Sequence, residues 1–169
     1  MNPAVTPEDR SWLTLAAELA GLCPPSTTAF SVGAVIVDGA GREIARGHSR
    51  ETGPRLHAEE VALARLAPDD PRLRSATLYS SLEPCSQRAS RPRSCTRLIL
   101  EALIPRVVIA WREPDVFVAD CRGAELLTQA GVEVTECSDL AGRAMAPNRH
   151  LPGVVPAAGT GREEPDRRH

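Results

Sequence analysis

Lysine is absent from this sequence of 169 residues, in which all 20 basic residues are arginine. Such uniform use of arginine indicates a compositional bias, so any single arginine says less about function than usual. The 22 acidic residues leave a net charge of -2, and aromatic residues make up only 3% of the chain. These values argue against a nucleic-acid partner, because such a partner needs a basic surface, commonly with aromatic side chains interleaved.

The sequence also lacks a long apolar run and a secretory leader. No segment approaches the roughly 20 apolar residues of a membrane span, and the first residues, MNPAVTPEDRSW, lack the basic-then-apolar pattern of a signal peptide. We therefore expect a cytoplasmic protein with no membrane partner. In a reducing compartment the odd number of five cysteines indicates thiols, metal ligands or catalytic groups rather than a disulfide framework.

The composition is that of one globular domain. Hydrophobic residues make up 42% of the chain and charged residues 25%, which are ordinary values for a folded protein. The length suits one domain with its own core, which we place at residues 1–150. From Leu151 the sequence is rich in proline, glycine and charge without periodicity, so we expect residues 151–169 to form a flexible tail.

Periodicity and turn residues predict alternating helices and strands. Thr6 and Pro7 are typical of a helix start, and apolar residues then recur at helical spacing as far as residue 22. We expect strands over 31–38, 42–50, 76–84, 106–111 and 132–137, and further helices over 56–66, 95–103 and 122–131. Right-handed crossovers would make the last three strands parallel, with helices on both faces. The fold class is therefore α/β.

Three side chains that suit zinc are expected at one edge of this sheet, where strand carboxyl ends and helix amino ends gather. His57, Cys85 and Cys95 would supply one imidazole and two thiolates. Zinc takes such ligands tetrahedrally, and three protein ligands leave one position for water, as in a catalytic site. Cys121 is the alternative ligand, because it would close the shell and make the zinc structural if it reached this edge.

A catalytic zinc site of this composition also needs a carboxylate to take a proton. Two thiolates cancel the charge of Zn²⁺, so the ion acidifies its water less than it would among neutral ligands. Glu59 and Glu60 both follow His57 closely. Helix geometry favours Glu60, because residues three apart share a face. Both side chains of a first turn can nevertheless lean toward one site, so this pattern leaves the choice open.

Two segments resemble the zinc-dependent cytidine deaminase superfamily, whose pattern is H-x-E followed by P-C-x-x-C with variable insertion. Here the first segment reads H57-A58-E59, and the second reads P84-C85, nine residues and C95. The LEPCS context, the long insert and RVVIAWREPD resemble in particular the deaminase half of the bifunctional deaminase/reductase of riboflavin biosynthesis. The resemblance spans roughly residues 10–150.

The resemblance implies a three-layer α/β/α fold with a five-stranded mixed sheet in the order 2-1-3-4-5. It implies one Zn²⁺ per chain, held by His57, Cys85 and Cys95. Glu59, rather than Glu60, would move protons while water replaces an exocyclic amine on an aminopyrimidine and ammonia leaves. The substrate would be a base, nucleoside or nucleotide, and the enzyme would be a hydrolase. Members of the superfamily commonly pair, so a homodimer is expected.

Residues that hold the substrate are less clearly marked. The peptide around Ala58 and the backbone from Ser81 to Glu83 are candidate donors to the ring. The riboflavin enzymes carry Asn-Pro-x-Val-Gly at the entry to their first strand, and that asparagine helps hold the substrate. Here the stretch reads TTAFSVG, which puts Phe30 and Ser31 at this place. Phe30 is a candidate to stack on the base, with burial in the core as the alternative.

The insert between the two cysteines departs from the riboflavin enzymes, which have eight residues there, with histidine. This chain has nine, including Arg88, Arg91 and Arg93. These arginines would grip a substrate phosphate, or they form a solvated loop. No reductase sequence follows within the 169 residues. We therefore expect a free-standing deaminase, acting either on the riboflavin intermediate or on a changed substrate.

Two other functions are consistent with the same residues. The first is deamination of a nucleobase within RNA, which the long arginine insert allows and the net acidity opposes. The second is a module without catalysis, in which zinc is structural and Cys121 fills its open position. Alanine at Glu59 would abolish deamination and leave a structural module unchanged, whereas alanine at Cys121 would cost such a module its zinc.

Overall fold

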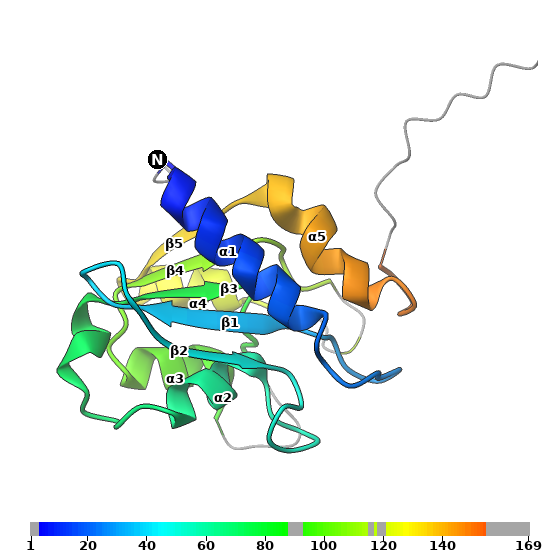
Figure 1. Ribbon diagram of the computed structural model, residues 1–169, viewed down its shortest axis with the longest axis horizontal. Helices are drawn as coiled ribbons and strands as arrows, with labels where there is room; N and C mark the ends of the chain where they lie inside the picture. The colour runs from blue at the N-terminus through cyan, green and yellow to red at the C-terminus, as the bar shows by residue number, and fades with distance from the viewer. Residues whose placement is uncertain (1–3, 88–92, 115–116, 118–120, 155–169) are drawn as a thin grey trace, which may run out of the picture.

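The computed structural model describes residues 4–87, 93–114, 117 and 121–154 (Figure 1). Arg88 and Arg91 of the predicted arginine loop lie outside these residues. The strands are β1 (Gly33–Val37), β2 (Glu43–His48), β3 (Thr77–Ser80), β4 (Arg106–Ile109) and β5 (Glu133–Glu136). The helices are α1 (Pro7–Ala20), α2 (Ala58–Ala64), α3 (Cys95–Glu101), α4 (Gly123–Gln129) and α5 (Ala141–Met145), with short 3-10 turns at Pro71–Ser75, Ser138–Leu140 and Ala146–Asn148.

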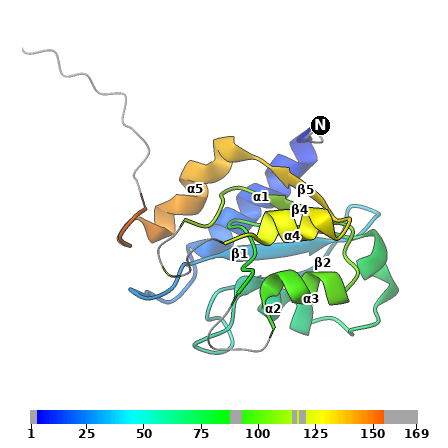
Figure 2. The same ribbon diagram turned by 180° about the vertical axis from the view of Figure 1, so that it is seen from behind.

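The five strands form one mixed sheet in the order β2-β1-β3-β4-β5, which confirms the expected order. β3, β4 and β5 are parallel, with Leu78 opposite Val107 and Val107 opposite Val134. β1 is antiparallel to both of its neighbours. Figures 1 and 2 show α1 and α5 on one face of the sheet and α2, α3 and α4 on the other, so the three-layer α/β/α fold is confirmed.

The alternation of side chains along the strands builds a core on each face. Val35 and Val108 pack on the side of α1, whereas their neighbours Ile36 and Val107 pack on the side of α2, α3 and α4. All four of these side chains are fully buried. Burial of an apolar side chain of this size contributes about 1.5–3 kcal/mol, so the two-sided burial of the central strands holds the sheet edge that carries the site.

Helix α1 begins as the sequence predicts. The Thr6 side chain accepts from the N–H of Asp9, the Asp9 carboxylate accepts from the N–H of Thr6, and Pro7 occupies the first helical position. The helix ends at Ala20 rather than at residue 22, and Leu22 is largely exposed. Within the described part of the chain, no helix combines the length and the apolar character needed to cross a membrane.

The carboxyl-terminal part of the chain differs from expectation. No helix was predicted after the last strand, yet α5 packs beside α1. Leu151 and Val154 are buried in the core on that face, so packing continues four residues into the segment expected to be a tail. Residues 155–169 lie outside the described part of the chain.

The strand predicted over 31–38 begins only at Gly33, because the backbone of Ser31 is bonded to a residue that follows α5. The Ser31 N–H donates to Oδ1 of Asn148 over 2.6 Å, and the Asn148 amide donates to the carbonyl of Ser31 over 3.0 Å. Both backbone groups of Ser31 are therefore bonded to a side chain instead of a neighbouring strand. This pairing ties the entry to β1 to the turn that follows α5, 117 residues further along the chain.

Candidate active site

Three potential metal ligands converge where β3 ends and α2 and α3 begin. His57 is the N-cap of α2, Cys85 follows the turn after β3, and Cys95 is the first residue of α3. Nδ1 of His57 lies 3.6 Å from Sγ of Cys85 and 3.3 Å from Sγ of Cys95. All three ligand atoms lie within 4.8 Å of one another. The predicted meeting of helix amino ends and strand carboxyl ends is thus observed.

These separations fit a zinc ion. With Zn–N near 2.0 Å and Zn–S near 2.3 Å, tetrahedral geometry places a nitrogen and a sulfur ligand about 3.5 Å apart. Both sulfurs are buried, and a neutral imidazole with two thiolates is a donor set that zinc prefers. The chain therefore offers three ligands for one Zn²⁺ without rearrangement of its backbone.

The start of α3 also favours thiolate at Cys85. The N–H of Cys95 points to Sγ of Cys85 over 3.2 Å. Hydrogen bonds from Cys95 outweigh the effect of burial and, together with His57, lower the pKa of Cys85. A thiolate is the form of cysteine that binds a metal, so this backbone donor prepares one ligand for the ion.

The fold distinguishes Glu59 from Glu60. Glu59 is buried, and its Oε1 accepts a hydrogen bond from the Ser80 hydroxyl over 2.9 Å. Burial raises the pKa of Glu59, an effect that the nearby His57 only partly offsets. Glu60 instead turns back along the helix, where its Oε1 accepts from the N–H of His57 over 3.0 Å. Glu60 therefore caps the helix, and Glu59 is the carboxylate beside the metal ligands.

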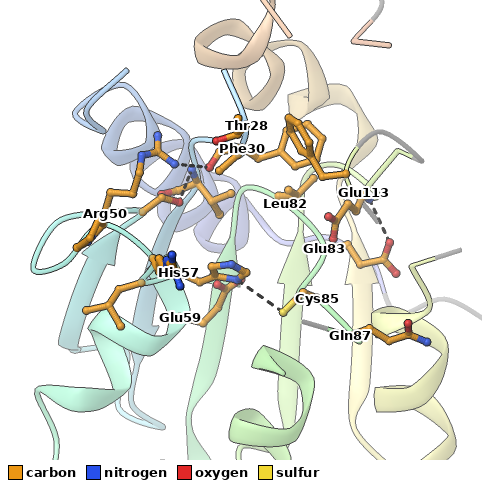
Figure 3. A pocket seen from close by; sticks show the side chains of 17 residues that line it. Thr28, Phe30, Arg50, His57, Glu59, Leu82, Glu83, Cys85, Gln87 and Glu113 are labelled. Atoms are coloured by element: carbon orange, nitrogen blue, oxygen red, sulfur yellow. Dashed lines mark hydrogen bonds between the residues drawn. The ribbon is translucent and has the colours of Figure 1, made fainter. Parts of the chain in front are cut away.

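A cavity of about 360 Å³ opens above these groups and contains His57, Glu59 and Cys85 in its wall. Figure 3 shows these three side chains close together, with Phe30 and Leu82 above them and Glu83 and Glu113 to one side. Small-molecule sites occupy cavities of about 300–1,000 Å³. The cavity is thus large enough for a small ligand whose reacting atom contacts the metal ligands.

Phe30 is one of two predicted substrate residues that line this cavity; the other is Glu83. Its ring packs edge-to-face against Trp111 and Phe117, with centroid separations of 5.6 and 5.0 Å. The side chain is only 8% exposed, so Phe30 is buried in the core and also forms part of the cavity wall. Ser31 and Ala58 are buried and are not part of the cavity wall.

Glu83 reaches the cavity, but its hydrogen bonds serve the fold. Its carboxylate accepts from the N–H of Glu113 and from the N–H of Ala124, over 3.1 and 2.8 Å. The N–H of Glu83 itself donates to the carbonyl of Trp111, and the N–H of Ser81 donates to the carbonyl of Gly33. These two backbone donors, expected to hold a substrate ring, are therefore used within the protein.

Arg93, the one described member of the predicted arginine loop, lies away from the cavity. Its guanidinium pairs with Glu101 of α3 over 3.1 Å at the protein surface. The described arginines that do line the cavity are Arg50 and Arg55, in the segment between β2 and α2. Arg50 donates to the carbonyls of Pro24 and Phe30, so it holds the chain that enters β1.

Cys121 does not complete the metal site. Among the described residues, the cluster of metal-ligand side chains contains His57, Cys85 and Cys95 and excludes Cys121. Sγ of Cys121 instead faces the carbonyl of Pro84 at 3.8 Å. Burial and the nearby Glu113 raise the pKa of Cys121 to about 12, which keeps it a neutral thiol. Among the residues that the structure describes, three ligands would therefore hold a zinc ion and leave one position open.

Comparison with known proteins identifies the family. The family described as "Cytidine and deoxycytidylate deaminase zinc-binding region" matches residues 6–111. The chain belongs to this family. The predicted membership of the zinc-dependent deaminase family is confirmed, and the cluster of His57, Cys85 and Cys95 is consistent with one zinc.

Several relatives belong to riboflavin biosynthesis, as the resemblance predicts. The chain is 44% identical to "Diaminohydroxyphosphoribosylamino-pyrimidine deaminase" of Schizosaccharomyces pombe over 116 residues, which cover 68% of this chain and 28% of that protein. It is 35% identical over 130 residues to "Riboflavin biosynthesis protein RibD" of Aquifex aeolicus, covering 75% of this chain and 34% of that protein. The chain thus spans about a third or less of the length of these curated relatives.

A solved structure agrees with this assignment. The Thermotoga maritima protein named diaminohydroxyphosphoribosylaminopyrimidine deaminase/5-amino-6-(5-phosphoribosylamino)uracil reductase superposes with a TM-score of 0.67 at 33% identity. The match covers 83% of this chain and 39% of that one. The deaminase family and the α/β/α fold are therefore supported by the sequence comparison and by the superposition.

Proposed function

We propose that this protein is a zinc-dependent hydrolase that deaminates a diaminohydroxyphosphoribosylaminopyrimidine. The observation that carries the proposal is the buried Glu59 carboxylate beside three ligands that fit zinc, all in the wall of one cavity. The name of the Schizosaccharomyces pombe relative, at 44% identity, supports this substrate. The reaction replaces the bond between a ring carbon and its exocyclic amino nitrogen by a C=O bond, with water as the oxygen donor and ammonia as the second product.

His57, Cys85 and Cys95 would hold the metal. When bound, zinc supplies a Lewis acid that lowers the pKa of water and so makes it nucleophilic at neutral pH. Glu59 takes one proton from the attacking water and delivers it to the ring nitrogen next to the attacked carbon. It then takes the second proton, from the new hydroxyl group, and delivers it to the departing amine, which leaves as ammonia. Glu59 is buried, so bulk solvent does not reach its carboxylate. The proton transfers therefore pass directly between Glu59 and the reacting groups.

Ser80 suits both states of Glu59. Its hydroxyl lies within hydrogen-bond distance of Oε1 of Glu59, at 2.9 Å, and of the carbonyl of Leu82, at 2.7 Å. A hydroxyl has one proton to donate and can also accept. It can therefore donate to ionised Glu59, or accept from protonated Glu59 while donating to Leu82. This alternation keeps the Glu59 side chain oriented throughout the reaction.

The side chains in the cavity wall suit the pyrimidine ring and the phosphate of the proposed substrate. Phe30 and Leu82 offer apolar surface above the metal ligands (Figure 3). Arg50 and Arg55 bring positive charge to the cavity wall, and arginine is well suited to a phosphate group. The proposed substrate combines a flat ring with a phosphate, which matches this distribution of apolar and basic groups.

The decisive experiment measures ammonia release by the zinc-loaded protein. The panel contains the phosphoribosylated diaminopyrimidine, its dephosphorylated form, cytosine, cytidine, cytidine monophosphate and a short RNA. We expect turnover of the phosphorylated diaminopyrimidine and at least tenfold lower kcat/KM without the phosphate. Turnover of RNA alone would favour the RNA deaminase, and zinc binding without any turnover would favour a structural zinc module.

The homodimer expected from the family resemblance is also part of this proposal, as is a cytoplasmic location. The five cysteines are unpaired in the structure, and thiol ligands for zinc persist best in a reducing compartment. Light scattering on the zinc-loaded protein tests the dimer, since a mass near 18.1 kDa would mean a monomer.

A further inference from the structure

Glu113 is a carboxyl group in the active-site cavity that the reaction described above does not use. It follows β4 and lines the cavity together with His57, Glu59 and Cys85. In Figure 3 Glu59 and Glu113 lie on opposite sides of the cavity. Glu113 therefore stands where it would meet the part of a bound ring that does not react.

The backbone at Glu113 is fixed by a hydrogen bond to the side chain of Glu83. The buried carboxylate of Glu83 accepts from the N–H of Glu113 with one oxygen and from the N–H of Ala124 with the other. Glu83 is only 3% exposed, so these charge-assisted bonds form out of contact with solvent. The backbone position of Glu113, at the wall of the cavity, is thus set by the fold.

No described arginine forms a salt bridge with the Glu113 carboxyl. Its described hydrogen-bond partner is the Cys121 thiol, which is at most a weak donor, and His57, Cys85 and Glu59 act on it electrostatically. Burial raises the pKa of Glu113 to about 7, and this thiol offsets the effect only in part. A carboxylate offers two oxygens with about four acceptor sites, so most of this acceptor capacity is available to a ligand.

We propose that Glu113 is a specificity-determining residue whose carboxylate accepts hydrogen bonds from the nitrogen groups that the substrate keeps. This inference rests on the proposed function. The Thermotoga maritima protein is named as a deaminase and as a 5-amino-6-(5-phosphoribosylamino)uracil reductase. This uracil is what deamination of the proposed substrate would leave, and it retains an amino group and a ribosylamino N–H on neighbouring ring carbons. Two neighbouring N–H donors match the two oxygens of one carboxylate, as in bidentate pairs with arginine.

The arrangement also explains how one ring orientation is chosen. The diaminopyrimidine carries two free amino groups, and only the one beside Glu59 and the metal ligands is removed. A carboxylate on the opposite side of the cavity binds amino groups, but it repels the carbonyl oxygens of a ring bound the other way round. Glu113 therefore acts on orientation and affinity and takes no part in proton transfer.

The test compares Glu113→Gln with wild type on the phosphoribosylated diaminopyrimidine. Gln keeps the size of the side chain but has one acceptor oxygen and no charge. We expect kcat/KM to fall about 10- to 100-fold, chiefly through KM, because hydrogen bonds to charged groups contribute more than neutral ones. Zinc content and the thermal midpoint should stay at wild-type values. Glu113→Asp, which keeps the charge, should recover part of the loss and serves if the Gln variant folds poorly.

Two controls separate recognition from a structural role. Cys121→Ala removes the protein partner of Glu113 and leaves the carboxyl in place, so it should retain wild-type KM within about threefold, as a group that touches no ligand does. Glu125→Gln removes an exposed carboxylate of α4 that pairs with Arg122 and should change nothing. Equal losses in Cys121→Ala and Glu113→Gln would overturn the proposal in favour of a structural contact.

A substrate analogue that lacks the retained amino group completes the test. If Glu113 binds that group, the loss caused by Glu113→Gln should shrink at least fivefold with the analogue, as coupling in a double-mutant cycle requires. An undiminished loss, or wild-type KM in Glu113→Gln, would overturn the role of Glu113 alone. A wild-type enzyme that turns over neither compound would overturn the proposed function and this inference with it.

Discussion

The hydroxyl of Ser80 and the carboxylate of Glu59 form a buried hydrogen bond of 2.9 Å between the end of β3 and the first turn of α2. The contact joins the strand that leads to Cys85 to the helix whose N-cap is His57. Proton transfer and metal binding therefore share one rigid junction, and the two functions can be separated by substitution.

Glu59→Gln should lower kcat by about 10²–10⁴-fold, the usual contribution of general acid–base catalysis, while one zinc per chain is retained. The amide keeps the size of the side chain and can still meet Ser80, but it cannot carry the proton. Ammonia release and metal analysis of the same sample check this. Glu60→Gln is the matched control, because Glu60 caps α2, so it should reduce stability slightly and leave kcat near wild type. If only the Glu60 variant were inactive, Glu60 rather than Glu59 would be the residue that transfers the proton.

Cys85→Ser should lose most of its zinc and its activity, since the ligand with the lowered pKa is removed. Cys121→Ser should keep one zinc, because Cys121 lies outside the ligand cluster. Metal content after dialysis against a weak chelator distinguishes the two. Zinc loss from the Cys121 variant would point instead to a closed, structural site.

The buried cluster of Asp9, Tyr79 and Arg106 should make stability depend on pH. The Asp9 carboxylate accepts from Arg106 at 2.7 and 2.9 Å and from the Tyr79 hydroxyl at 2.8 Å. Burial opposes the charge of Asp9, but the hydrogen bonds from Arg106, from the N–H of Thr6 and from Tyr79 outweigh it and hold the pKa of Asp9 well below its usual range.

A depressed carboxylate pKa stabilises the fold above the pKa of the unfolded chain, near 3.8, and this stabilisation is lost as the pH falls below that value. The free energy of unfolding of the wild type, measured with urea, should therefore decrease as the pH falls from about 5 toward 3. Asp9→Asn should unfold more easily at pH 7, by about 2–4 kcal/mol, since it leaves Arg106 without its buried partner. It should also lose much of the pH dependence. Asp69→Asn, at an exposed carboxylate, should follow the wild-type curve.

Gly123→Ala should destabilise the protein by about 2 kcal/mol or more, as overpacked sites do. A Cβ at Gly123 would lie 1.9 Å from the carbonyl oxygen of Pro84, the residue before Cys85. Either α4 or the metal-binding turn must then move, so zinc affinity should fall as well. Gly142→Ala in α5 is the control, because its Cβ meets nothing within 4 Å and alanine favours a helix. Thermal unfolding of both variants decides the point.

Local patterns predicted most of the fold. The Thr6 and Pro7 start signal, the apolar run of β1 and the crossover order of β3, β4 and β5 depend on near neighbours in sequence, and each is observed. Helix α5 was missed because its five residues, AGRAM, offer too little periodicity. Its stability comes from packing against α1, which only the folded chain reveals.

Local patterns also predicted the metal ligands of the site, but they did not decide which carboxylate lies beside them. His57, Cys85 and Cys95 have a recognisable spacing, but helix periodicity favoured Glu60 where the fold brings in Glu59. The reason is that Glu60 is engaged by the N–H of His57. Glu113 and Asn148 gave no sequence signal, since their partners Glu83 and Ser31 lie 30 and 117 residues away. Contacts over such separations depend on the whole topology.

The two hydrogen bonds accepted by Glu83 also bear on how this enzyme can diversify. They anchor both ends of the segment that runs from Glu113 to Ala124, independently of what lies between. For a segment anchored in this way, doubling its length costs only about 0.6 kcal/mol in closure entropy. Insertions beside Phe117, which lines the cavity, would alter the cavity wall at little thermodynamic cost while the metal ligands and Glu59 stay in place.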